Sequence, residues 1–174
     1  SALGVAQDAL AEQVVRLHVV ANSDSEADQA LKLKVRDAVL AEATPYLAGL
    51  DRQAALNALE ELLPSLAGAA ARVVGEQGYD YSVTASLQEE RFPTKRYEGF
   101  AMPAVEYMAL PVQIGSGGVQ NWWCVMYPPL CMGSVEETAQ LDDRDRALIT
   151  GETEGYVVKF KAIELWEEFK AWFA

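Results

Sequence analysis

The chain offers few side chains for nucleophilic chemistry, namely one histidine, His18, and two cysteines, Cys124 and Cys131. An imidazole can activate a thiol as its general base, and a carboxylate such as Asp24 can orient the ring. A cryptic extracytoplasmic hydrolase that uses His18, Asp24 and Cys124 is therefore one hypothesis. It requires the three groups to lie within about 3 Å of their partners in a cleft.

The surroundings of the cysteines do not favour this hydrolase. No cation that would lower a thiol pKa stands beside Cys124 or Cys131. A disulfide is a second possibility, because six residues separate the two and a Pro-Pro pair can reverse the chain between them. Two buried free thiols fit the sequence equally well. One histidine and two cysteines at this spacing do not indicate a zinc site, so we expect no metal, no cofactor and no catalytic residue.

His18 stands inside residues 14–20, a run rich in β-branched residues that predicts a strand. Alternation places its ring on the opposite face from its apolar neighbours, where a lone histidine is more often structural than catalytic. Asn22, Ser23 and Asp24 follow this strand. They either cap the next helix or supply polar groups to a binding site at the end of the strand.

Two adjacent tryptophans, Trp122 and Trp123, fall within a predicted strand and must face opposite sides of it. At most one of them enters a one-sided core. The other is either an anchor for a partner protein or is covered by a closing helix that carries Trp166 and Trp172.

The elements that must position these residues begin with two helices. Ser23 followed by Glu26 forms a capping box and predicts the start of the first helix. Asp51 predicts the cap of the second, which runs to about Val74 with a kink or break at Pro64.

Strands are predicted over 79–87, 107–114 and 121–127, with Gly115–Gly118 as a hairpin-like turn. We expect these strands to form an antiparallel meander. Pro111 predicts that the middle strand lies at an edge or carries a bulge.

A last strand over 156–160 and an amphipathic helix over 162–173 complete the pattern. The expected fold class is α+β, with residues 1–174 as one domain. An N-terminal strand and two helices precede a mostly antiparallel sheet and a C-terminal helix.

The composition argues against several function classes. The formal net charge is −12, from 14 basic and 26 acidic residues, so nucleic acid and anionic lipid are repelled on average. The short basic groups Lys32, Lys34 and Arg36, and Lys95 and Arg96, are interpreted as solvated faces. The sequence contains no glycine-rich phosphate-binding loop that would indicate a small-molecule substrate.

Four stretches follow the pattern of one family, in order, over roughly residues 14–131. They are RLHVVANSDS (16–25), DQALKLKVRDAV (28–39), FPTK (92–95) and NWWCVMYPPLC (121–131). On these residues the chain resembles the stage II sporulation protein R family of endospore-forming bacteria. It departs from the family at residues 107–111, where Tyr-Met-Ala-Leu-Pro replaces Tyr-Glu-Ala-Leu-Arg, so a salt bridge through that strand is not carried over.

The resemblance implies a protein that is made in the forespore and secreted into the space between the two membranes, after removal of a hydrophobic export segment. There it activates a membrane-embedded aspartic protease, stage II sporulation protein GA, which cleaves the precursor of sigma factor E. Such a protein is a signal and not an enzyme. It meets the membrane surface only through its partner.

The polar loop and the unusual aromatic pair predict the surface that contacts the protease. Its expected members are His18, Asn22, Ser23, Asp24, Lys95, Trp122 and Trp123.

Overall fold

The computed structural model describes residues 9, 11–92, 94–97, 100–102 and 104–128. Its elements are β1 (Val15–Val20), α2 (Glu26–Leu47), α3 (Arg52–Glu76), β2 (Val83–Ala85), β3 (Gln88–Arg91), β4 (Lys95–Tyr97), β5 (Phe100–Met102), β6 (Glu106–Ile114) and β7 (Asn121–Tyr127). This is an α+β arrangement, as the sequence predicts. The strand expected over 156–160 and the helix over 162–173, with Trp166 and Trp172, lie outside the described residues.

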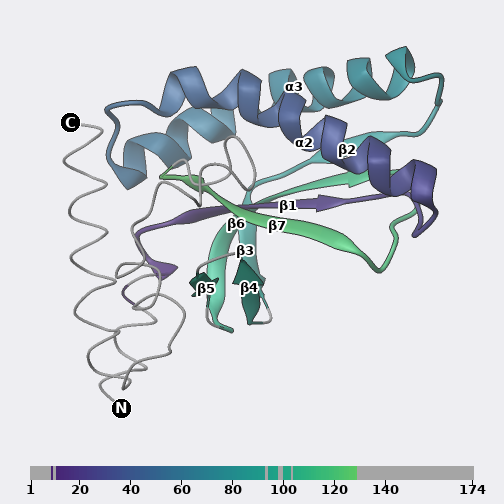
Figure 1. Cartoon of the computed structure of the whole chain (residues 1–174). Coiled ribbons are helices and arrows are strands. Elements are labelled where there is room, and N and C mark those ends of the chain that lie inside the picture. Colours follow the sequence, from purple (N-terminus) through teal and green to yellow (C-terminus); the bar gives the residue numbers. More distant parts are fainter. Residues whose placement is uncertain (1–8, 10, 93, 98–99, 103, 129–174) are drawn as a thin grey trace.

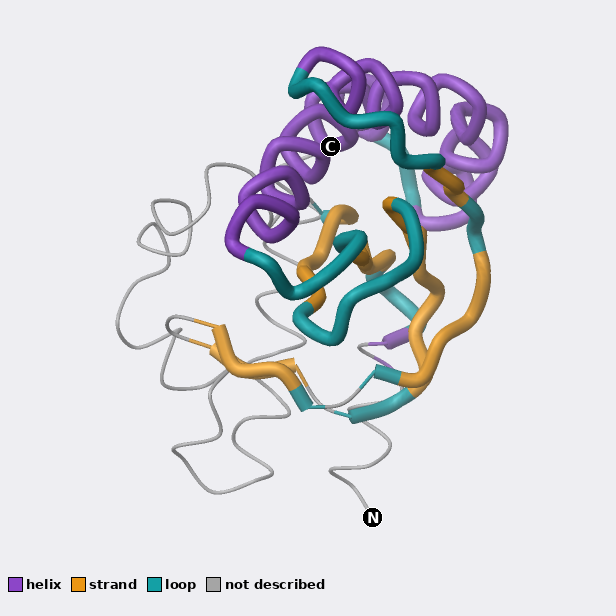
Figure 2. The backbone as a smooth tube through the Cα atoms, turned by 90° about the vertical axis from the view of Figure 1, so that its right-hand side faces the viewer, coloured by secondary structure: helices purple, strands orange, loops and turns teal. Residues whose placement is uncertain are grey.

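Two long helices cover one face of a mixed sheet (Figure 1). The strands follow the order β2, β6, β1, β7, and β3 also pairs with β6. Figure 2, seen from the side, shows the helices as one layer and the strands as a second layer beneath them. The short β4–β5 pair forms a separate ribbon on the side of the sheet away from the helices.

The predicted antiparallel meander is wrong, because β6 and β7 are not neighbours. β1 lies between them, parallel to β6 and antiparallel to β7. Val15, Leu17 and Val19 are buried, as expected of a strand in the middle of a sheet. The turn at Gly115–Gly118 therefore passes across the end of β1 and does not close a hairpin. Only β2 and β3 pair with β6 in the expected antiparallel sense.

Pro111 lies in an interior strand, and the pairing registers on both sides of it are continuous, so the predicted edge position or bulge is also wrong. β2 and β3 pair with β6 in one continuous register, and Ser86, between them, lies opposite Pro111. The Ser86 N–H donates to the Pro111 carbonyl over 3.2 Å. Proline has no N–H with which to return this bond. The interruption between β2 and β3 follows from that missing donor.

The helices begin close to where the sequence places them. Ser25, and not Ser23, is the N-cap of α2, because its hydroxyl accepts from the N–H of Asp28. Asp51 caps α3 as predicted, by accepting from the Ala54 N–H. Of the predicted kink or break at Pro64, the break is wrong, since α3 continues through this residue.

The core fills the space between the helices and the sheet. Its fully buried aliphatic residues come from every layer and include Leu17, Val19, Val35, Val39, Leu59, Leu66, Leu110, Val112 and Ile114. Burial of such side chains contributes roughly 1.5–3 kcal/mol each. The strand residues of this set alternate in sequence, which fixes which residues of β1 and β6 point to the other face.

Candidate functional site

The polar residues after β1 form a hydrogen-bonded group, here called the loop cluster: Asn22, Ser23, Asp24, Ser25 and Asp28. Asp28 is its centre. One carboxylate oxygen, Oδ2, accepts from the Ser23 hydroxyl over 2.6 Å and from Asn22 Nδ2 over 3.0 Å. The Ser25 hydroxyl accepts from the Asp28 N–H over 3.1 Å. The cluster therefore joins the end of β1 to the first turn of α2.

These bonds set the ionisation of the buried carboxyl. The hydrogen bond from Ser23, followed by the one from Asn22, lowers the pKa of Asp28, and burial opposes this shift. A hydrogen bond with Tyr81 acts in the same direction as Ser23. That same bond raises the pKa of the Tyr81 phenol, because the phenol donates to a carboxylate. The cluster is built around an ionised Asp28.

The loop cluster also holds the connection between β6 and β7. Asp24 Oδ1 accepts from the N–H groups of Val119 and Gln120, each over 2.8 Å. Asn22 Oδ1 accepts from the Ser116 N–H over 3.0 Å. Two loops that are far apart in sequence are thereby fixed to each other at one end of the sheet.

Two glycines allow this close approach. Gly115 has a φ of 60°, and a Cβ there would overlap the amide of Asn22. A Cβ on Gly118 would lie 2.8 Å from Asp24 Oδ1. Glycine also permits the positive φ of this turn at Gly115 and at Gly117, whose φ is 93°.

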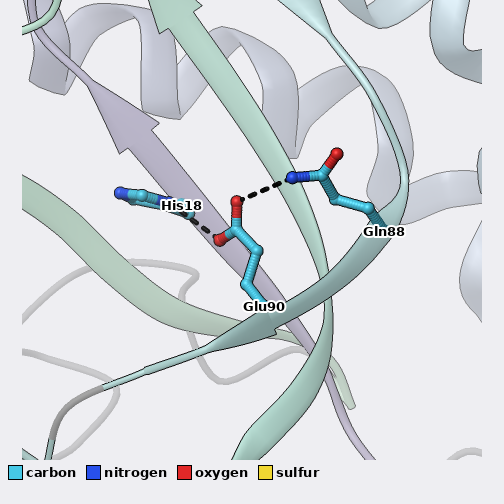
Figure 3. A network of polar contacts seen from close by, with 3 residues as sticks. All are labelled: His18, Gln88 and Glu90. Atoms are coloured by element: carbon cyan, nitrogen blue, oxygen red, sulfur yellow. Dashed lines mark hydrogen bonds and ion pairs between the residues drawn. The ribbon is translucent and has the colours of Figure 1, made fainter.

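His18 points away from the helices, as the alternation predicts. Its ring stacks on Trp123, with centroids 3.8 Å apart and planes 11° apart. Its Nδ1 lies 2.9 Å from Glu90 Oε2, and Gln88 Nε2 donates to the other oxygen over 3.2 Å. Figure 3 shows Glu90 between His18 and Gln88. The imidazole of β1 is thus held by a carboxylate from β3 and an indole from β7.

The same face buries a charge. Arg16 is completely buried, and its guanidinium lies 4.3 Å from the ring centre of Phe92 and 4.6 Å from that of Tyr107. Phe92 also meets Trp123 edge-on, with centroids 4.6 Å apart. Cation–π contacts of this kind strengthen when water is excluded. The face away from the helices is therefore an aromatic layer and not a wet surface.

The two tryptophans face opposite sides of β7, as predicted. Trp123 joins His18, whereas Trp122 turns towards α2. There the Arg36 guanidinium lies 4.3 Å from the centre of the Trp122 ring. Both rings are half-buried.

The seven residues predicted to contact a partner do not gather in one place. Asn22, Ser23 and Asp24 lie together in the loop cluster, at one end of the sheet. His18 and Trp123 lie on the face away from the helices, and Trp122 lies on the helix face. Lys95 belongs to the separate β4–β5 ribbon (Figure 1).

The three groups of the hydrolase hypothesis do not converge either. Cys124 is paired with Leu17 and is buried in the core between sheet and helices, whereas His18 points to the opposite face. Asp24 lies in the loop cluster, where it accepts from two backbone N–H groups. Cys131 lies outside the described residues, so its predicted pairing with Cys124 stays a prediction.

Within the described part of the chain, no three or more His, Cys, Asp or Glu side chains are placed to hold a metal ion. Over the same residues, no helix is both long and apolar enough to cross a membrane.

The comparison with known families rests on most of the chain. The family described as Stage II sporulation protein R (spore_II_R) matches residues 11–137. The chain belongs to this family. The match covers the sheet, both helices, the loop cluster and the tryptophan pair.

One curated member of the stage II sporulation protein R family is the protein of that name from Bacillus subtilis (strain 168). It is 37% identical to this chain over 121 residues, which are 69% of this chain and 54% of the relative. The chain thus spans about half the length of the relative that it matches. No solved structure is similar enough to count as a match.

Sequence reasoning missed several residues that the structure brings into the site. Lys32 and Arg36 were interpreted as part of a solvated face, but they are only 6% and 8% exposed. That interpretation is wrong for these two residues, although Lys34 is exposed. A signal was available: Lys32 and Arg36 are four residues apart, so they share a helix face that Lys34 does not.

Proposed function

We propose that this chain is an intercompartmental signal of sporulation. It is secreted from the forespore into the space between the two membranes and activates the membrane-embedded aspartic protease stage II sporulation protein GA. The protease then processes the precursor of sigma factor E. Membership of the stage II sporulation protein R family, over residues 11–137, carries this proposal. The finer steps come from what the family resemblance implies.

The arrangement of the side chains supports a role by contact and not by chemistry. His18 and Cys124 lie on opposite faces of the sheet, and Asp24 is engaged by backbone donors. A ligand without chemistry activates an enzyme by binding its active state more tightly than its resting state. A tenfold preference, about 1.4 kcal/mol, shifts that equilibrium tenfold.

Reconstituted processing tests this function. The protease and the sigma factor precursor are produced together in a host that does not sporulate, with this chain exported, retained inside or omitted. Processing is expected only with the exported chain. Equal processing in all three cultures contradicts the proposal. Full processing with a folded His18→Ala variant would exclude hydrolase chemistry, because a signal that acts by contact requires no general base.

A direct binding measurement accompanies the processing assay. The outer segment of the protease, immobilised, is expected to retain the purified chain, and the comparison is repeated with a reductant. A bridge between Cys124 and Cys131 predicts weaker retention after reduction, together with a mass increase of two hydrogens. An unchanged mass shows that the two thiols are free in the purified chain.

A further inference from the structure

The start of β7 rests against two buried cations of α2. Lys32 and Arg36 are one helical turn apart and 6% and 8% exposed, and both face the strand. The Lys32 ammonium lies 3.4 Å from the Gln120 carbonyl, just before β7. Arg36 covers the ring of Trp122, two residues further on. We call Lys32, Arg36 and Trp122 the seam.

The seam side chains themselves carry donors and no acceptors. Of the three, only the Trp122 N–H lacks a partner among the residues that the structure describes, because Lys32 donates to Gln29 Oε1 and to the Gln120 carbonyl. An ammonium, a guanidinium and an indole N–H can only donate. Among the described residues, Arg36 donates only to Asp37, through Nε over 2.9 Å and Nη2 over 2.8 Å. Trp122 Nε1 is buried and has no hydrogen-bond partner in the described part of the chain. A buried donor without an acceptor costs roughly 1–3 kcal/mol.

The buried charges of the seam are both positive. Burial, followed by repulsion from Arg36, lowers the pKa of Lys32, and attraction to Asp24 only partly opposes this. The side chain of Asp37, which pairs with Arg36, is 66% exposed, so water screens its charge. Two buried cations thus lie together in a protein whose net charge is −12. An added negative charge would reduce the repulsion between Lys32 and Arg36. It would also supply an acceptor for the Trp122 N–H.

We propose that the seam binds a carboxylate from an acidic side chain on the surface of the protease partner. This inference rests on the proposed function and names the chemistry of its contact. A carboxylate has only acceptors, and its two oxygens match the planar fork of a guanidinium. Because Arg36 lies on the Trp122 ring, its fork is already oriented before the partner arrives. An anionic membrane is the poorer occupant, since it repels the whole molecule.

The test uses two substitutions that keep the shape of the seam. Trp122→Phe removes the indole N–H and keeps an aromatic ring beneath Arg36. Arg36→Gln removes the charge and keeps polar donors. Each is expected to weaken binding to the immobilised outer segment of the protease about tenfold or more, the loss of one charge-assisted hydrogen bond. Processing of the sigma factor precursor should fall in parallel.

Matched controls separate the seam from the rest of the surface. Lys34→Gln removes a neighbouring but exposed cation, which bonds Gln77 at the end of α3. Tyr46→Phe removes a donor from an aromatic ring that is 56% exposed on the same helix. Both variants should bind as the parent does. The acidic residues of the outer segment are also replaced by their amides, one at a time. One of these replacements should weaken binding of the parent and leave binding of Trp122→Phe unchanged.

Different failures have different meanings. If the parent itself neither binds nor activates the protease, the proposed function fails. If the parent binds and the folded Trp122→Phe and Arg36→Gln variants bind equally well, the function stands and the seam is overturned. Thermal unfolding of each variant establishes that it is folded. Binding of the parent to vesicles of anionic phospholipid, lost in the same two variants, overturns the carboxylate as the ligand.

Discussion

Two polar regions lie within three turns of each other at the start of α2, and they differ in how completely their groups are paired. In the loop cluster, the Asp28 carboxylate meets donors from Ser23 and Asn22. In the seam, Arg36 is left with a mostly exposed carboxylate, and the Trp122 N–H has no acceptor in the described part of the chain. Buried polar groups in folded proteins are normally paired, so unpaired ones need a reason.

This difference distinguishes polar groups that stabilise the fold from polar groups that are available to bind a partner. A satisfied network rigidifies the fold, and its removal lowers stability. A buried donor without an acceptor, such as the Trp122 N–H, adds nothing to stability through hydrogen bonding, and its removal should instead change affinity. The loop cluster was part of the predicted contact surface, whereas two of the three seam residues were not. Substitutions in the loop cluster should therefore lower stability, whereas substitutions in the seam should lower affinity for the partner.

The largest loss of stability is expected from Asp28→Asn. The amide cannot accept from all of the donors around Asp28, and its own N–H₂ would face them. Because Asp28 is only 5% exposed, the free energy of unfolding should fall by about 2 kcal/mol. Urea denaturation measures this, with Asp80→Asn at an exposed position as the control. A loss no larger than that of the control would show that the network is not structural.

Acid should produce part of the same loss in the parent. The pKa of Asp28 is lower in the folded chain than its ordinary value of 3.8, so its ionised form stabilises the fold above that pH. This contribution is lost as the pH falls from 3.8 through the lower folded value. Denaturation curves between pH 5 and about 2.5 should show a steeper fall for the parent than for Asp28→Asn. Parallel curves would contradict the assignment.

A smaller loss is expected from Asn22→Ala. This change removes a donor to Asp28 and the acceptor for the Ser116 N–H, at a half-buried position. The free energy of unfolding should fall by roughly 1 kcal/mol. Asn57→Ala provides the comparison, because Asn57 accepts one exposed hydrogen bond from Gln53 on α3. Equal losses in the two variants would mean that the link between the loops adds little.

Local patterns predicted local structure well. Asp51 caps α3, and alternation correctly placed His18 opposite its apolar neighbours and the two tryptophans on opposite faces of their strand. Pairing between distant strands was not predictable in this way. Both a meander and the observed order satisfy the alternation of β6 and β7, and no local signal shows that β1 lies between them. Only the long-range contacts of the folded chain decide the order.

The site was predictable in its residue types and not in its partners. Asn22, Ser23 and Asp24 were recognised as a polar group at the end of a strand, but their acceptors and donors come from Asp28 and from a loop about ninety residues later. Charge patterning suggested that Lys32 and Arg36 are solvated. Their burial depends on β7, which packs beside α2 only in the folded structure.

The smallest change in stability is expected from Trp122→Phe, and this makes it the sharpest comparison. The smaller ring loses some contact with Arg36, worth about 0.5–1 kcal/mol. The substitution also removes a buried donor that has no acceptor in the described part of the chain, and this relief is of similar size and opposite sign. The two effects should cancel to within about 0.5 kcal/mol in urea denaturation. A loss as large as that of Asp28→Asn would mean that the indole N–H is paired within the fold and that the seam, like the loop cluster, serves structure alone.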